Sequence, residues 1–338
     1  MARRDIPNIR RARLQDVATA AGVSVVTVSR ALNAPATVSA RTRERIDAAM
    51  QAVDYVPDLA ARGMAKQRSD IVAVLVPTLL DPIFVDMVRG LEGVLAAHGM
   101  HLLIGDTGYD PDREEAFVAA ALGRRPDGLV LTGTQHTPRA RRLAAGSGVP
   151  VVETWGIEGE PIDRAVGYDQ RAAALALTRH VLDRGYERVA YVGRPVSGNG
   201  RAAAKRDGYL AALRAAGMAV VPELLMECVT SMEAGKDAIK RLVRRGGADA
   251  IVFSGDRIAA GAFLHCLDTG LRVPDDVAVC GFGDHDIARL LPGGLTSVRA
   301  DSVQIGRLAG EAIVDGRVDD GGPRSVDIGF EVVVRGST

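Results

Sequence analysis

The sequence predicts an all-α helix-turn-helix head, a short hinge, and an α/β core of two doubly wound parallel-sheet subdomains. Three observations support this fold class. Two short helical patterns separated by a glycine open the chain, and a proline-containing segment follows at residues 55–69. From Ile71 onward, short apolar runs alternate with amphipathic stretches, which is typical of parallel sheets covered by helices.

Charge is unevenly distributed along the 338 residues, although the formal net charge is zero. Residues 1–68 hold 12 Lys and Arg against 6 Asp and Glu, which leaves 30 against 36 in the remainder. A compact basic head suits contact with a polyanion, because neutralising phosphates releases condensed counterions. The remaining part is too long for one doubly wound domain, so we expect two sheets with a cleft between them.

The head begins with two short helices joined by a tight turn. Gly22 supplies the turn residue, and Ser24 is a good N-cap for the second helix. A third amphipathic helix is predicted over residues 41–53. The apolar residues expected to face inward are Leu14, Val17, Ala18 and Ala21 in the first helix, with Val23, Val28 and Leu32 around the second.

The hinge is predicted over residues 58–69. Pro57 ends the third helix, Asp58 can cap a new one, and residues 59–65 have helical propensity interrupted by Gly63. A helix this short is not stable alone. Its alternative is an ordinary flexible linker.

The core shows a repeated βα pattern. Strands are expected at residues 71–76, 101–104, 128–131, 149–152, 188–192, 250–253 and 277–280, and helices at residues 84–98, 113–122, 171–184 and 257–269. In open sheets of this kind a ligand binds outside the carboxyl ends of the strands.

Several classes of protein are excluded by motifs that the sequence lacks. It has no Gly-x-Ser-x-Gly elbow, no phosphate-cradling glycine loop and no His-rich metal spacing, so we expect neither an enzyme nor a cofactor. Cys228, Cys266 and Cys280 lack metal-ligand spacing and are expected to be small apolar residues. No long apolar run and no signal-peptide pattern is present, so we expect a cytoplasmic protein.

The head resembles the lactose/galactose repressor family. The resemblance rests on the motifs Asp16-Val-Ala, Ala21-Gly-Val-Ser, Thr27-Val-Ser-Arg, Leu32-Asn and Thr42-Arg. It implies that the helix at residues 24–32 lies in the DNA major groove, with Val25, Val26 and Arg30 directed at base edges. Arg30 can pair with guanine through two hydrogen bonds, whereas the valines offer only apolar contact.

Other positions of this helix are better suited to phosphate contacts, namely Ser24, Thr27, Ser29 and Asn33. Instead of contacting bases, Val25 and Val26 could pack in the core of the head, and Arg30 could be a solvated surface arginine. In the family, the hinge segment folds on DNA and a leucine enters the minor groove. Met64 occupies that position here, and Gly63 lowers helix stability by roughly 1 kcal/mol relative to alanine.

The resemblance continues through the core and implies a fold like that of periplasmic sugar-binding proteins. Matching stretches include Asp81-Pro-Ile-Phe, Val166-Gly-Tyr-Asp-Gln and Gly281-Phe-Gly. By this analogy the chain crosses between subdomains near Tyr168, Ser297 and Ser325. The expected domains are a head at residues 1–57, a hinge at residues 58–69 and a core at residues 70–338. Within the core, the first subdomain takes residues 70–167 and 298–324, and the second takes residues 168–297 and 325–338.

Within the family, the run Leu131-Thr-Gly-Thr-Gln-His-Thr-Pro resembles the gluconate-operon repressors. Many relatives carry a ligand-binding aspartate at the position of Gly283, so the cleft has lost a negative charge. Arg201, Lys205 and Arg206 follow a predicted strand and could face the cleft as cations, although some could be solvated. Both features favour a sugar acid as the effector.

Three further candidates for effector contact each have a structural alternative. Phe84 either stacks on a ligand or packs in the core. His136 either hydrogen-bonds a ligand hydroxyl or caps its loop, and Asp256 either contacts ligand or caps a helix.

The expected function is therefore a transcriptional regulator, in particular a repressor, whose operator affinity responds to a sugar acid such as gluconate. The expected partners are a near-palindromic double-stranded DNA operator, the effector and a second copy of the chain, with no membrane. No heptad repeat follows Val334, so a coiled-coil tetramer is not expected. The alternative is a sensor of the same fold for a neutral sugar or another metabolite. The operator, the effector, and whether the effector releases or promotes DNA binding stay open.

Overall fold

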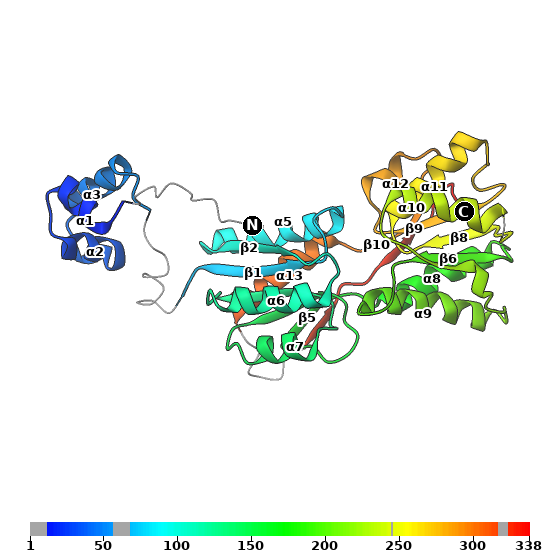
Figure 1. Ribbon diagram of the computed structural model, residues 1–338, viewed down its shortest axis with the longest axis horizontal. Helices are drawn as coiled ribbons and strands as arrows, with labels where there is room; N and C mark the ends of the chain where they lie inside the picture. Colours follow the sequence, from blue (N-terminus) through cyan, green and yellow to red (C-terminus); the bar gives the residue numbers. More distant parts are fainter. Residues whose placement is uncertain (1–11, 57–67, 245, 317–323) are drawn as a thin grey trace, which may run out of the picture. The chain divides into compact units, whose positions relative to one another are not determined.

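The computed structural model describes residues 12–56, 68–244, 246–316 and 324–338. The chain divides into two compact units, residues 1–69 and 70–338 (Figure 1). The expected hinge helix, with Gly63 and Met64, lies outside the described residues.

The first unit is helical throughout its regular elements. Gly22 ends the first helix with a φ of 62°, a left-handed conformation that suits glycine. Ser24 caps the second helix as predicted, because its Oγ accepts a hydrogen bond from the Thr27 amide at 3.1 Å. The elements are α1 (Leu14–Ala21), α2 (Val25–Asn33), the 3-10 helix η1 (Pro35–Thr37) and α3 (Ala40–Ala52). Their common core consists of Val17, Ala18, Ala21, Val28, Ile46 and Ala49.

The second unit contains two six-stranded sheets, as the βα pattern predicted. The first has the strand order β11-β5-β4-β3-β1-β2, and its strand pairs are parallel. Its strands are β1 (Ile71–Val76), β2 (His101–Asp106), β3 (Gly128–Thr132), β4 (Val151–Trp155), β5 (Arg164–Gly167) and β11 (Ser325–Asp327). Its helices are α5 (Pro82–Ala97), α6 (Pro111–Leu122), α7 (Pro138–Ala145) and α13 (Ser302–Asp315).

The second sheet has the strand order β12-β10-β9-β8-β6-β7, with β12 antiparallel to β10 and the other pairs parallel. Its strands are β6 (Val189–Gly193), β7 (Leu225–Glu227), β8 (Ala250–Phe253), β9 (Ala278–Phe282), β10 (Thr296–Arg299) and β12 (Glu331–Val333). Its helices are α8 (Gln170–Asp183), α9 (Gly200–Ala215), α10 (Met232–Arg244), α11 (Asp256–Thr269) and α12 (Asp286–Leu290), with the 3-10 helix η2 (Pro222–Leu224).

Alternate residues of each strand enter different cores because successive side chains point to opposite faces. In β1, Val72 and Val74 pack under α5 and α13, while Ala73 and Leu75 pack under α6 and α7. In the second sheet, α8 and α9 cover one face and α10, α11 and α12 cover the other. Each subdomain is therefore a three-layer αβα unit.

Close packing of helix pairs depends on glycine. A Cβ at Gly90 of α5 would overlap the carbonyl group of Val303 on α13, and a Cβ at Gly306 of α13 would overlap the carbonyl of Met87. Helix α13, although it follows the second subdomain in sequence, is thus fixed against the first.

The chain crosses between the two sheets three times, after β5, after β10 and after β11 (Figure 1). By analogy with the family, the third crossing was expected near Ser325. Ser325–Asp327 instead forms β11, which pairs with β5 in the first sheet, so the return follows Asp327. The second crossing follows Arg299, two residues beyond the expected position.

The described residues contain neither a membrane-spanning helix nor a cluster of metal ligands. No helix among them is long and apolar enough to cross a bilayer. No group of three or more His, Cys, Asp or Glu residues in that part of the chain is arranged to hold a metal ion. Cys266 and Cys280 are buried and Cys228 is half-buried.

Candidate DNA-binding face and ligand cleft

Helix α2 presents a mixed polar and apolar face to solvent. Val26 is 60% exposed and Arg30 is also exposed, so neither belongs to the head core. Val25 is half-buried and packs against that core. The sequence analysis gave both valines the same expected role, but the structure separates them. Val26 is exposed and available for a base contact, whereas Val25 also packs against the core of the head.

The hydroxyl groups of α2 already stabilise the helix. Ser24 Oγ lies 2.8 Å from Thr27 Oγ1 in addition to capping the Thr27 amide. The amide nitrogen of Asn33 donates to Ser29 Oγ at 3.3 Å. Because each hydroxyl retains further hydrogen-bonding capacity, these contacts are compatible with binding a phosphate.

A cleft lies between the two subdomains, at the carboxyl ends of strands from both sheets. Its central cavity has a volume of about 50 Å³ and is lined from the first subdomain by Asp81, Ile83, Tyr109, Trp155 and Tyr168. From the second subdomain it is lined by Arg194, Asn199, Arg201, Ala202, Lys205, Thr230, Ser254, Gly255, Ile258, Phe282 and Gly283, with Ala300 at a crossing.

Two arginines fill much of this cleft. The guanidinium carbon of Arg201 lies 5.3 Å from the ring centroid of Phe84 and 5.6 Å from that of Trp155. The guanidinium carbon of Arg194 lies 3.5 Å from the ring centroid of Tyr109, and its Nη1 donates to Thr230 Oγ1 at 3.0 Å. In both arginines Nε is buried and has no hydrogen-bond partner, so each has a donor to offer a ligand.

Lys205 is the third basic residue of the cleft. It is buried, its Nζ donates to the carbonyl oxygen of Ser254 at 3.1 Å, and the same atom lies 3.9 Å from the ring centroid of Phe282. Burial and the neighbouring Arg201 lower the pKa of Lys205 to about 7.

The single carboxylate in the lining of the central cavity is already paired. Asp81, which caps α5, lies 3.1 Å through its Oδ1 from Nε2 of His285 in the opposite subdomain. Despite burial, this contact raises the pKa of His285, and the same pairing lowers the pKa of Asp81. The acid next to Gly283 is neutralised as well, since Asp284 lies 2.6 Å from Nη1 of Arg335 and 3.6 Å from Nη1 of Arg299.

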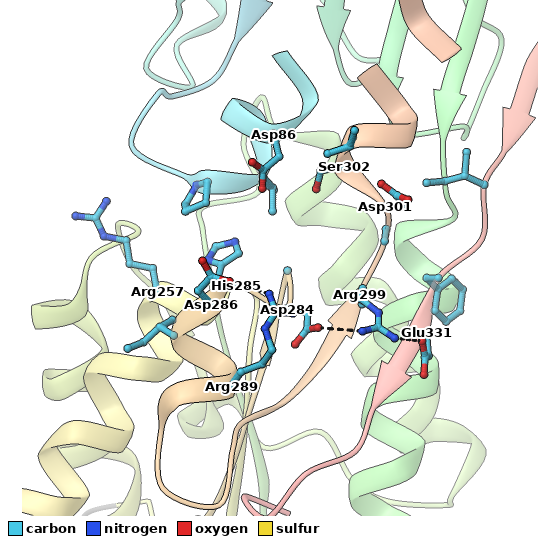
Figure 2. A pocket seen from close by; sticks show the side chains of 18 of the residues that line it. Asp86, Arg257, Asp284, His285, Asp286, Arg289, Arg299, Asp301, Ser302 and Glu331 are labelled. Atoms are coloured by element: carbon cyan, nitrogen blue, oxygen red, sulfur yellow. Dashed lines mark hydrogen bonds and ion pairs between the residues drawn. The ribbon is translucent and has the colours of Figure 1, made fainter. Parts of the chain in front are cut away.

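Two wider cavities flank the central one. The larger, of about 950 Å³, is lined by residues that include Asp86, Arg257, Asp286, Arg289 and Glu331 (Figure 2). Figure 2 shows Arg299 between Asp284 and Glu331, both of which it contacts. The other cavity, of about 580 Å³, shares Tyr109, Asn199 and Arg201 with the centre. Both wider cavities therefore share lining residues with the central one.

Three residues predicted to contact effector lie elsewhere or are fully engaged. Phe84 is buried in the core, edge-on to Trp155 with 5.5 Å between ring centroids, so it supports the cleft from behind. Arg206 pairs with Glu227 at 3.6 Å and does not line the central cavity. It follows Lys205 on α9, and consecutive helical residues face different directions.

His136 is the third of these, because both of its ring nitrogens are occupied. Nδ1 lies 2.6 Å from Glu114 and Nε2 lies 3.1 Å from Glu153, inside the first subdomain. Although burial opposes the charge, the two carboxylates raise the pKa of His136 to about 9. The side chain joins α6 to β4 through these two contacts, and it also lines the neighbouring cavity of about 580 Å³.

Asp256 and Gly283 shape the cleft around His285. The Asp256 carboxylate accepts hydrogen bonds from Ser297 Oγ at 2.6 Å and from the His285 amide at 2.7 Å. Asp256 is buried and outside the cavity lining, so it positions His285. Gly283 has a φ of 127°, and a Cβ there would lie 2.6 Å from His285 Nε2.

Sequence reasoning missed Asp81, Tyr109, Arg194, Asn199 and His285 as cleft residues. Their common signal is position: Arg194 directly follows β6, Tyr109 follows β2, and His285 follows β9. The carboxyl ends of parallel strands are where a ligand is expected, so polar residues at these points could have been selected.

The comparisons with known proteins agree with this architecture. Residues 13–58 match the family described as bacterial regulatory proteins, lacI family, and residues 69–328 match the periplasmic binding proteins and sugar binding domain of the LacI family. A helix-turn-helix head followed by such a core defines a DNA-binding transcriptional regulator. The chain belongs to the LacI family.

Relatives at full length support the same assignment. The chain is 34% identical over 326 residues to the HTH-type transcriptional regulator GntR of Escherichia coli, covering 96% of this chain and 98% of that protein. A LacI-family regulator from Silicibacter pomeroyi has a crystal structure that matches with a TM-score of 0.89 at 29% identity, covering 96% and 99% of the two chains. The crystal structure of the regulator GntR from Chromobacterium violaceum matches with a TM-score of 0.73 at 33% identity, covering 79% and 98%.

Proposed function

We propose that this regulator is a homodimeric repressor whose affinity for a near-palindromic operator is lowered by a sugar acid of the gluconate type. The observation that carries the proposal is the charge of the cleft. Arg194, Arg201 and Lys205 line its central cavity, while the one carboxylate in that lining, Asp81, is paired with His285.

An acid suits this cleft better than a neutral sugar. The buried Nε donors of Arg194 and Arg201 lack partners, and a carboxylate can accept from them. Hydrogen bonds to a charged group contribute roughly 1.5–3 kcal/mol each, more than those to a neutral hydroxyl. Similarity to regulators named GntR also supports an acid as the effector.

Binding requires movement of side chains or subdomains. The central cavity of about 50 Å³ is smaller than a six-carbon acid, since a single water occupies about 30 Å³ of liquid. Arg201 lies between this cavity and the neighbouring one of about 580 Å³, so displacing its side chain joins the two. A ligand that prefers one arrangement of the subdomains shifts the protein toward it, and we propose that this arrangement releases DNA.

In the head, we propose that Arg30 and Val26 read bases and that Ser24, Thr27, Ser29 and Asn33 contact phosphates. Val25 contributes a base contact only at its exposed part. Met64 is proposed as the minor-groove residue on the basis of its position in the sequence.

Calorimetry with gluconate and glucose tests the effector assignment. The parent should bind gluconate at least about tenfold more tightly than glucose, because only the acid forms charge-assisted hydrogen bonds. Arg194→Met and Arg201→Met should each weaken gluconate binding, whereas Arg206→Met, outside the cleft lining, serves as the matched control. Preference for glucose would refute the sugar acid. Operator binding undiminished by saturating gluconate would refute its role in release.

A further inference from the structure

Lysine is rare in this chain. Of the 42 Lys and Arg residues, only Lys66, Lys205, Lys236 and Lys240 are lysines. Lys236 and Lys240 are half-exposed and pair on α10 with Glu233 and Asp237, while Lys66 lies outside the described residues. The buried basic position of the cleft thus carries a lysine in a chain that otherwise uses arginine.

The surroundings of Lys205 are poorly suited to an ammonium group. Its Nζ has one protein acceptor, the carbonyl of Ser254, whereas an ammonium group has three N–H donors. The ring of Phe282 covers another side, with its centroid 3.9 Å from Nζ; this cation–π contact favours the ammonium form, but it provides neither a carbonyl nor a carboxylate acceptor. Among the residues that the structure describes, no Asp or Glu oxygen lies within the 4.0 Å of an ion pair with Nζ.

The charged groups around Lys205 do not compensate. Arg201, one turn earlier on α9, opposes a second positive charge. Asp81, at the start of α5, is paired with His285, and Asp256, at the start of α11, is engaged by Ser297 and the His285 amide. His285 itself adds positive charge on the side of β9. A buried lysine in such a place loses its proton readily, whereas an arginine would not.

We propose that at pH 8 most of the ligand-free protein carries an uncharged Lys205, which takes up one proton from solvent when the carboxylate of an acid effector binds. The amine lone pair takes the proton, and the resulting ammonium pairs with the carboxylate. This inference rests on the proposed function, because it assumes an acid as the ligand. The lowered pKa of Lys205, at about 7, agrees with it.

Proton uptake makes effector affinity depend on pH. Above the pKa of the free lysine, each further pH unit costs about tenfold in apparent affinity, because a scarcer proton must bind with the acid. Arginine at this position would keep its charge and remove the dependence. The regulator would then respond to acid effector and pH together.

The first measurement is the charge of Lys205 in the full-length protein without ligand. Lysine labelled with ¹³C at Cε gives one resonance per residue, and with only four lysines the signal lost in Lys205→Arg identifies Lys205. We expect its titration midpoint near 7, about three pH units below the ordinary value of a lysine side chain. A midpoint near that ordinary value of about 10.4 would overturn the inference.

The second measurement is gluconate binding by calorimetry at pH 8 in phosphate and in Tris, whose ionisation enthalpies differ. In the parent and in Arg206→Met, the binding enthalpy should differ between the two buffers. Divided by the difference in buffer ionisation enthalpy, this change should correspond to the uptake of close to one proton per bound ligand. Lys205→Arg should bind without this difference, and Lys205→Met should bind weakly without it. Buffer-independent binding in the parent would refute the uptake, and a difference that persists in Lys205→Arg would assign the proton to another group. Complete absence of gluconate binding would instead refute the sugar-acid effector, and the titration midpoint would still decide the charge of Lys205.

Discussion

Nε2 of His285 lies 3.1 Å from Oδ1 of Asp81, and this ion pair joins the two subdomains across the cleft. Asp256 fixes the His285 backbone, and Gly283 leaves room for its ring. Gly283 therefore lies beside a contact between the two subdomains, where a side chain would meet the His285 ring.

Asp81→Asn should weaken this contact while keeping the cap of α5, since asparagine also caps helices. Because the pKa of His285 is raised above its ordinary value of 6.5, protonated His285 contributes fully to the free energy of unfolding below pH 6.5. This contribution is lost as the pH rises through the raised pKa. The lowered pKa of Asp81 means that its contribution is present above 3.8 and is lost as pH falls through the lowered value. Urea unfolding at pH 6 should therefore show a loss of roughly 1.5–3 kcal/mol that shrinks in alkali. His101→Ala, at an exposed site, is the control, and a loss that is constant from pH 6 to 9 would contradict the ion pair.

The Glu114–His136–Glu153 cluster should stabilise the first subdomain up to mildly alkaline pH. The pKa of His136 is raised from 6.5 to about 9, so its contribution is complete below 6.5 and disappears as pH rises through 9. His136→Leu should cost on the order of 2–4 kcal/mol at pH 6 and less at pH 10, by the linkage between pKa and stability. Chemical unfolding of both proteins across this range is the measurement. If His136→Leu were as stable as the parent but bound gluconate more weakly, His136 would instead be a ligand contact.

Gly283→Asp, which looks like a test of charge, also changes the shape of the cleft. A Cβ at Gly283 would displace the His285 ring, and the backbone there has a φ of 127°. Gly283→Ala alone should therefore destabilise the core by roughly 1–3 kcal/mol. Calorimetry should show weaker gluconate binding in both variants, and only the difference between them reports charge. Wild-type stability and binding in Gly283→Ala would show that His285 can move without cost.

Ser24 should reveal separate contributions to folding and to DNA contact. Ser24→Ala removes the cap of α2 and should destabilise the head by about 1 kcal/mol. Ser24→Asp keeps a capping oxygen but adds a negative charge, so it should leave the melting temperature of the head unchanged and weaken all DNA binding. Equal DNA affinity in Ser24→Asp and the parent would exclude a phosphate near this residue.

Arg30→Ala should weaken operator binding by roughly 1–3 kcal/mol and largely spare nonspecific DNA. Val26→Ala should cost less and relax specificity at a thymine, because it removes only an apolar contact. Fluorescence anisotropy on operator and scrambled duplexes separates the two classes of contact. A parallel loss on both duplexes would make Arg30 a phosphate contact.

Several regular elements could be predicted because their signals are local. Alternation and apolar runs located β1, β3 and β8, and capping located α2. The short strands β7, β10, β11 and β12 have three or four residues each and depend on neighbours distant in sequence, so no local pattern identifies them. Ser325–Asp327 belongs to the first sheet because its backbone pairs with β5, not because its residues have a high strand propensity.

The candidate site was predictable in residue type but not in orientation. Arg201 and Lys205 were selected correctly as cleft residues because they follow a strand, whereas Arg206 differs from Lys205 only by its direction from α9. His136 could not be assigned because its partners Glu114 and Glu153 come from two other elements. A single sequence does not show which distant carboxylates will meet a histidine.

The route of the chain through the two sheets sets an order for folding during synthesis. The first subdomain needs α13 for its buried face and β11 for its sheet edge, and both follow residue 300. By then the ribosome has already released residues 170–299, which form most of the second subdomain. The N-terminal half of the core must therefore wait with one face of its sheet covered by α5 but not yet by α13. A nascent chain with such an exposed apolar face is prone to aggregate or to engage a chaperone.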